Sequence, residues 1–225
     1  SEETTTLAIR TYQLSFGNGL TDSLKMLLPG SQSLRSVEED GRGGAITCGH
    51  TYNPQKADRD ILINYLDATG KTIRSLTFGT EMDEGPRQTG IDEQRNYFIA
   101  YFQGTTKYAR YSLNRIRSFN EEGEMVYDID LELPEGLFYD LVPLGDGELV
   151  VIGTNKTSAT THEVAIIKLA ADGTVLWRKG LSYPDVSSIS RGFLEGEVLY
   201  LIDYTTQKII SLDIQNGETL TDLAF

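Results

Sequence analysis

Short apolar runs separated by turn-forming residues extend along almost the whole chain. In residues 162–180, an apolar run over 164–169 leads into a polar turn that ends on Gly173. A second run follows and contains Val175 and Trp177. Two strand-length runs joined by a short turn predict a β-hairpin. Glycine suits the end of such a turn because the backbone there needs a positive φ angle, which side chains disfavour.

The hairpin recurs at a nearly constant spacing. Turn glycines stand at positions 19, 70, 123, 173 and 217, so successive turns lie 51, 53, 50 and 44 residues apart. In three copies an apolar residue, Leu66, Phe119 or Leu169, stands four positions before the glycine, and in the last copy Leu212 stands five positions before it. The first copy fits the pattern only loosely. The recurrence predicts a repeated unit of about 50 residues.

Each complete repeat also contains two earlier strand-length runs. The second of them covers, in successive repeats, residues 45–49, 97–104, 148–153 and 197–204. A weaker first run precedes each, at residues 33–38, 87–92, 137–144 and 187–194. No stretch has the pattern of a long amphipathic helix. Four antiparallel strands repeated about every 50 residues are typical of the blades of a β-propeller.

We therefore predict an all-β fold, a β-propeller built from four-stranded antiparallel blades. Four complete blades are expected, at residues 31–80, 85–133, 136–182 and 186–225. An N-terminal hairpin at 7–28 supplies only a third and a fourth strand. It forms an incomplete fifth blade, extends the edge of another blade, or belongs to a longer propeller of which this chain is one part. The polar residues 1–6 are expected to be a flexible segment, and 7–225 a single propeller domain.

Charge and composition narrow the classes of partner. The formal net charge of −13, from 33 acidic and 20 basic residues, disfavours nucleic acid because its phosphates would repel the chain. No apolar run reaches the roughly 18 residues of a membrane-spanning helix. Cys48 is the only cysteine, so the chain offers no internal disulfide and no cysteine pair for a metal.

Two segments resemble a known group of repeats. The first, Gly43 to Gly79, contains G-G-x-I-x-x-G-x-T and D-I-L-I-x-x-L-D-x-x-G, and the second, Val150 to Gly180, contains A-I-I-K-L-A-A-D-G-T-V-L-W. Both resemble the repeats of secreted bacterial β-propellers, which are common among Bacteroidetes surface and exported proteins. The start, Ser1-Glu2-Glu3, resembles the acidic segment after the lipid-bearing cysteine of lipoproteins in that group. The resemblance implies an exported protein at the cell surface or in the periplasm of a Gram-negative bacterium, with a lipid anchor upstream of Ser1 as its only membrane link.

One face of the predicted blades carries the longer loops. In a four-stranded meander, the loops from second to third strand and those between blades leave on the same face, and here they are long and variable. Binding residues usually lie on such loops. Tyrosine and arginine are enriched in binding hot spots, and aromatic rings with polar edges suit sugars. The candidate ligand-binding residues on this long-loop face are His50, Tyr52, Arg59, Arg87, Tyr108, Arg110, His162 and Tyr183.

No set of residues has the spacing of a catalytic or metal centre. His50 and His162, the two histidines, show neither H-x-H nor H-E-x-x-H spacing. Cys48 lies in an apolar run, where a small buried residue is expected. Acidic stretches such as 81–84 lack the calcium-loop pattern and are expected to be solvated, and Trp177 is expected to pack between blades. We therefore predict no catalytic residue, no metal and no cofactor.

The sequence favours a non-enzymatic binding or interaction module that recognises a protein or a glycan through the long-loop face. A repeat scaffold with one variable face and no catalytic constellation is the basis of this prediction. The alternative is a carbohydrate-active enzyme, a glycosidase or lyase, with its site at the axial mouth of the propeller. A purely structural role within a longer assembly is a third hypothesis.

Overall fold

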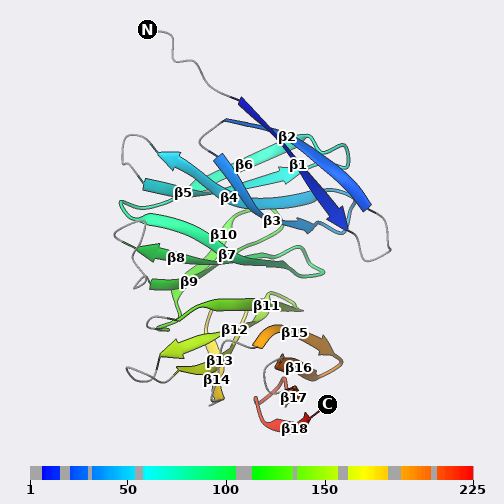
Figure 1. Ribbon diagram of the computed structural model, residues 1–225, viewed down its shortest axis with the longest axis vertical. Helices are drawn as coiled ribbons and strands as arrows, with labels where there is room; N and C mark the ends of the chain where they lie inside the picture. The colour runs from blue at the N-terminus through cyan, green and yellow to red at the C-terminus, as the bar shows by residue number, and fades with distance from the viewer. Residues whose placement is uncertain are drawn as a thin grey trace. The chain divides into compact units, whose positions relative to one another are not determined.

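The computed structural model describes residues 7–15, 21–29, 32–53, 58–104, 113–133, 136–156, 162–181, 189–203 and 207–224 (Figure 1). Side chains are described from Gln32 onward, apart from a few at strand ends. This part of the chain contains eighteen β-strands and no helix. The strands form one two-stranded sheet and four four-stranded sheets. The predicted all-β fold with four-stranded antiparallel blades is therefore confirmed.

Each four-stranded sheet is a meander in which neighbouring strands follow one another in the chain (Figure 1). The first sheet contains β3 (Gln32–Glu39), β4 (Ala45–Asn53), β5 (Asp58–Leu66) and β6 (Thr72–Phe78). The second contains β7 (Asp83–Ile91), β8 (Tyr97–Gly104), β9 (Leu113–Phe119) and β10 (Met125–Asp130). The third contains β11 (Phe138–Gly145), β12 (Glu148–Lys156), β13 (His162–Leu169) and β14 (Val175–Leu181). The fourth contains β15 (Ile189–Glu195), β16 (Val198–Asp203), β17 (Lys208–Asp213) and β18 (Thr219–Ala224).

The N-terminal hairpin forms a sheet of its own. β1 (Leu7–Ser15) pairs antiparallel with β2 (Thr21–Pro29), from Leu7 opposite Pro29 to Ser15 opposite Thr21. Among the described strands, neither pairs with a strand of a four-stranded sheet. The hypothesis that this hairpin extends the edge of another blade is therefore wrong. Residues 1–6 and the turn glycine predicted at position 19 lie outside the described residues.

The turn glycines have the backbone conformation that the repeat predicted. Gly70, Gly123, Gly173 and Gly217 have φ angles of 78°, 71°, 85° and 72°. The β7–β8 turn has no glycine, and Arg95 adopts a φ of 66° there. A left-handed conformation costs a side-chain-bearing residue about 1–2 kcal/mol. The cost is offset locally, since the next residue donates its backbone N–H to Asp92 Oδ1 at 2.7 Å.

The chain divides into two compact units. The first comprises residues 1–86 and 103–108, and the second comprises residues 87–102 and 109–225. The division passes through β7 and β8. The expectation of a single domain over 7–225 stays a prediction.

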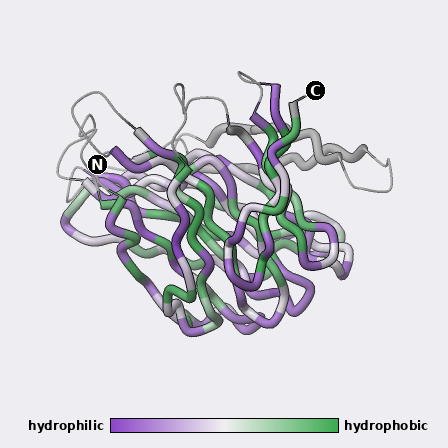
Figure 2. The backbone as a smooth tube through the Cα atoms, turned by 90° about the horizontal axis from the view of Figure 1, so that it is seen from below, coloured by the Kyte–Doolittle hydropathy of each residue, from purple (hydrophilic) through white to green (hydrophobic). Residues whose placement is uncertain are grey.

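The first unit has its core on β4 and β5. Ile46, Cys48, Ile61 and Ile63 are at most 2% exposed, whereas β6 is exposed along most of its length. The predicted burial of Cys48 is confirmed. In Figure 2, apolar stretches run along the strands and polar stretches gather at the turns.

In the second unit, the sheet β11–β14 lies between two apolar cores. Leu149 and Val151 of β12 belong to one core, which also contains residues of β8 and β9. Val150 and Ile152 belong to the other, which contains residues of β16 and β17. Alternate residues of a strand point to opposite faces, so both faces of this sheet are covered.

Polar contacts also link successive sheets of the second unit. Trp177 on β14 donates its indole N–H to the carbonyl of Ile214 at 3.1 Å, and its ring lies against Gly217. The prediction that Trp177 packs between blades is confirmed. Asp92 Oδ2 accepts the backbone N–H of Gly147 at 3.0 Å, which joins the β7–β8 turn to the β11–β12 turn.

Candidate functional site

The strand ends of the first unit bring together a group of charged and polar side chains. β7 begins at Asp83, several residues before the strand predicted at 87–92, so the link from β6 spans only residues 79–82. This link lies against the start of β5 and the end of β8 through the hydrogen bonds given below. We call Arg59, Thr80, Asp83, Glu84 and Gln103 the charged cluster.

Arg59 and Asp83 form a bidentate ion pair. The Arg59 Nε donates to Asp83 Oδ1 at 2.8 Å, and Nη2 donates to Oδ2. The backbone N–H of Arg59 also donates to Oδ1, at 3.2 Å. The hydrogen bond from Arg59 is the main cause that lowers the pKa of Asp83, and the same contact raises the pKa of Arg59. Two charge-assisted bonds in a fixed fork hold the start of β5 against the start of β7.

Glu84 is buried beside this pair. Its side chain is 1% exposed, and its Oε1 accepts hydrogen bonds from the Thr80 hydroxyl at 2.6 Å and the Gln103 amide at 3.1 Å. The backbone N–H of Thr80 donates to the same oxygen at 3.1 Å. Burial is the largest influence and raises the pKa of Glu84. These bonds fix the β6–β7 link to the end of β8.

Gly79 is required at the start of this link. A Cβ at this position would overlap the carboxylate of Asp60. Because the backbone passes so close to Asp60, any side chain would displace either the link or the carboxylate.

His50 lies near the cluster but does not form a catalytic dyad. The Ser33 hydroxyl is 3.1 Å from His50 Nδ1 and 3.0 Å from Nε2, so it faces the ring between the two nitrogens. A serine nucleophile needs one aligned bond to one nitrogen of a base. Asp83, whose pKa is also lowered slightly by the charge of His50, is bonded to Arg59. The arrangement therefore stabilises structure rather than activating Ser33.

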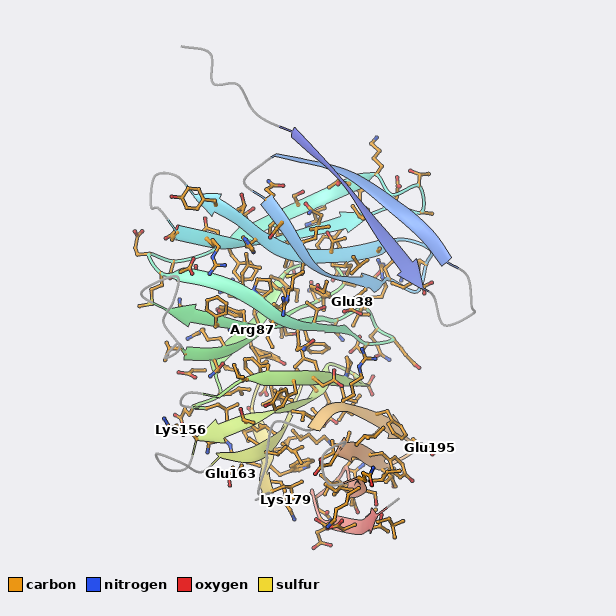
Figure 3. The ribbon with its side chains drawn as sticks, viewed as in Figure 1. Glu38, Arg87, Lys156, Glu163, Lys179 and Glu195 are labelled. Atoms are coloured by element: carbon orange, nitrogen blue, oxygen red, sulfur yellow. The ribbon has the colours of Figure 1, made fainter. Side chains whose placement is uncertain are left out.

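The structure brings three of the predicted ligand-binding residues together. Tyr52 and Arg59 are directly opposite each other in the β4–β5 ladder, and His50 lies two residues before Tyr52. Tyr52 is 45% exposed. Arg87 is separate, because it lies within β7 with its guanidinium 4.8 Å from the centre of the Phe102 ring (Figure 3). Its predicted placement in a loop is therefore wrong.

The other predicted ligand-binding residues cannot be joined to this group. Tyr108, Arg110 and Tyr183 lie outside the described residues. His162 is the first residue of β13, not a loop residue as expected, and pairs with Lys156, but its side chain lies outside the described part. Figure 3 shows Lys156 and Glu163 at this strand end. A role of these residues in ligand binding stays a prediction.

Sequence reasoning missed the acidic half of the cluster. Residues 81–84 were expected to be solvated, but Asp83 and Glu84 are buried. A polar run of this kind has no alternation that would mark a strand, so nothing local identifies them. The complementary charge, Arg59, stands 24 residues earlier and becomes informative only once the strand pairing is known.

The cluster has no arrangement for metal chemistry. Within the part of the chain that the structure describes, no group of three or more His, Cys, Asp or Glu side chains could hold a metal ion. Nor does that part contain a helix long and apolar enough to cross a membrane.

Four meander sheets with cores between successive sheets define a β-propeller-type fold. Solved structures of this type are similar to the chain. A protein of unknown function from Bacteroides caccae matches with a TM-score of 0.56 and 14% identity, over 95% of this chain and 74% of that one. The WD40 domain of Toxoplasma gondii coronin matches with a TM-score of 0.56 and 10% identity, over 88% of this chain and 46% of that one.

A chain of a nidogen/laminin complex is also similar. It matches with a TM-score of 0.50 and 14% identity, over 93% of this chain and 69% of that one. No protein-family model matches the sequence, and neither does any curated protein. At these identities the similarities establish the fold alone.

Proposed function

We propose that the chain is a non-enzymatic interaction module that contacts a protein partner with Tyr52 and Met82, on the long-loop side of the first blade. The observation that carries this proposal is the exposed Tyr52, opposite Arg59 in the ladder, whose side chain Asp83 holds in place. Met82, next to Asp83, is also exposed. Exposed aromatic and methionine side chains on a rigid polar frame have the character of protein-binding hot spots.

The state of the carboxylates supports binding over catalysis. A glycosidase needs two carboxyl groups free to act on opposite sides of a bond. Asp83 is bound by the Arg59 guanidinium, and one oxygen of Glu84 accepts hydrogen bonds from Thr80 and Gln103. A protein partner is also consistent with the similar chain from a complex of nidogen and laminin.

Site-specific photocrosslinking tests this proposal. Tyr52 is replaced by p-benzoylphenylalanine in the source cell, and Ile73, an exposed residue of β6, is replaced in the same way as the matched control. We expect one protein adduct from position 52 and none from position 73. Loss of that adduct in a Met82→Asp background would assign the contact to this patch.

Two results would contradict the proposal. The first is an identical set of adducts from positions 52 and 73, because contact would then be non-specific. The second is Tyr52-dependent binding to a glycan array without any protein adduct, which would assign the site to sugars.

We also propose that the module is exported to the cell surface or periplasm of a Gram-negative bacterium of the Bacteroidetes type, with a lipid anchor ahead of Ser1. The repeats over 43–79 and 150–180 and the acidic start support this proposal through their resemblance to proteins of that group. Metabolic labelling with a tritiated fatty acid and protease treatment of intact cells test it. Recovery of unlabelled protein in the cytoplasmic fraction would contradict it.

A further inference from the structure

The last sheet has one covered and one uncovered face. Leu199, Leu201, Ile210 and Leu212 belong to the core shared with β11–β14. The register places the alternate residues of the same strands on the opposite face. The apolar residues of this second face, which we call the open face, are Phe193, Tyr200, Ile202, Ile209 and Leu223.

The open face has the composition of a buried one. Phe193 is 46% and Leu223 is 61% exposed, while Tyr200, Ile202 and Ile209 are partly buried. β16 nevertheless reads V-L-Y-L-I-D, an uninterrupted apolar run of the kind found in strands buried on both faces. The rings of Phe193 and Tyr200 are stacked with centroids 5.0 Å apart, which makes a flat aromatic centre. Contiguous exposed apolar surface of this kind marks an interaction site.

The charges on β15 indicate what covers this face. Arg191, Phe193 and Glu195 alternate along one side of the strand, in the order basic, aromatic, acidic. Arg191 and Glu195 are both exposed, and Glu195 lies at the end of β15 (Figure 3). A twofold axis at Phe193 would place Arg191 of one copy opposite Glu195 of the other, twice per pair. The face is therefore complementary in charge to itself.

We propose that the open face of β15–β18 binds the open face of a second copy of this chain, as a twofold dimer centred on Phe193. Four strands about 4.8 Å apart and five residues deep give a footprint of about 300 Å2 per copy. That area is well below the roughly 800 Å2 per partner of a standard interface, so the dimer is weak and depends on concentration. The proposal is independent of the partner site at Tyr52.

Sedimentation equilibrium of the 225-residue chain across a range of concentrations tests the dimer. A salt concentration of about 0.15 M screens the long-range repulsion between two acidic chains but leaves close charge pairs intact. Phe193→Asp should weaken association at least about tenfold. The matched control, Leu176→Asp, makes the same change at a residue of β14 that is 49% exposed, and should leave association unchanged.

Charge reversal gives the sharpest result. Arg191→Glu and Glu195→Arg should each weaken the dimer about tenfold, because each creates two like-charge contacts. The double variant restores opposite charges and should recover the original association. A chain that stays monomeric at every concentration, or a double variant no better than the singles, would overturn the proposal. So would a Phe193→Asp chain that keeps its mass but melts at a much lower temperature, since the face would then be covered within one chain.

Discussion

Two neighbouring sheets of the second unit differ in how many of their faces are covered. β11–β14 has an apolar core on each side, and its central strands are buried throughout. β15–β18 shares one of those cores and leaves its other face partly exposed. The central strands of both sheets are equally apolar in sequence. The difference teaches that apolar pattern alone identifies a blade strand, while its neighbours decide how much of that pattern becomes stability.

Matched truncations in β12 and β16 should break this comparison most strongly. Ile152→Ala removes a fully buried side chain between two sheets and should cost about 2–5 kcal/mol of unfolding free energy. Ile202→Ala, on the open face, leaves less of a cavity and should cost at most about 1 kcal/mol. Urea unfolding of dilute protein measures both values. Equal costs would mean that the open face is covered in the monomer.

The joint between the two sheets can be tested at two glycines. Gly217 has a φ of 72° and lies against the Trp177 ring, whereas Gly196 has a φ of 60° and open space where a Cβ would stand. Gly196→Ala should cost about 1 kcal/mol through backbone strain alone. Gly217→Ala should cost about 1 kcal/mol more, because the added methyl meets the indole. Thermal unfolding of both variants isolates the ring contact, and equal losses would show that the indole moves aside at little cost.

The blade pattern was accessible from sequence because its signals are local. Gly70, Gly123, Gly173 and Gly217 satisfy a need for positive φ within the turn itself, so their spacing gave the repeat. Arg95 shows the limit of that signal, because the same turn conformation is held there by the Asp92 carboxylate instead of glycine.

The charged cluster was less accessible because it depends on pairing between distant segments. Asp83 and Glu84 are buried by contacts with Arg59, Thr80 and Gln103, and a run of acids with no partner in sequence reads as surface. Tyr52 and Arg59 could be placed on the correct side of the blade from loop length alone. Their register opposite each other required the β4–β5 ladder.

The smallest expected effect concerns the buried carboxylate of Asp140 at the joint between the two sheets. Its Oδ2 accepts the backbone N–H of Gly192 at 2.9 Å, and its Oδ1 accepts that of Leu141 at 3.0 Å. Burial raises the pKa of Asp140, while these bonds and the charge of Arg191 partly oppose the rise. A carboxyl with a raised pKa in the folded state favours folding when protonated, and this contribution is lost as pH rises through the folded-state pKa.

Asp140→Asn mimics the protonated carboxyl at every pH, so it should remove this dependence. Between about pH 4 and pH 7, the stability of the wild type should fall relative to that of the variant by less than about 1 kcal/mol, since the group is only partly buried. Thermal melts across this range measure the difference, with Glu122→Gln at an exposed turn as the control for general charge effects. A constant difference between wild type and Asp140→Asn would show that the two N–H donors and Arg191 fully compensate the buried charge. The joint would then stabilise the carboxylate as well as the apolar core stabilises the sheets on either side.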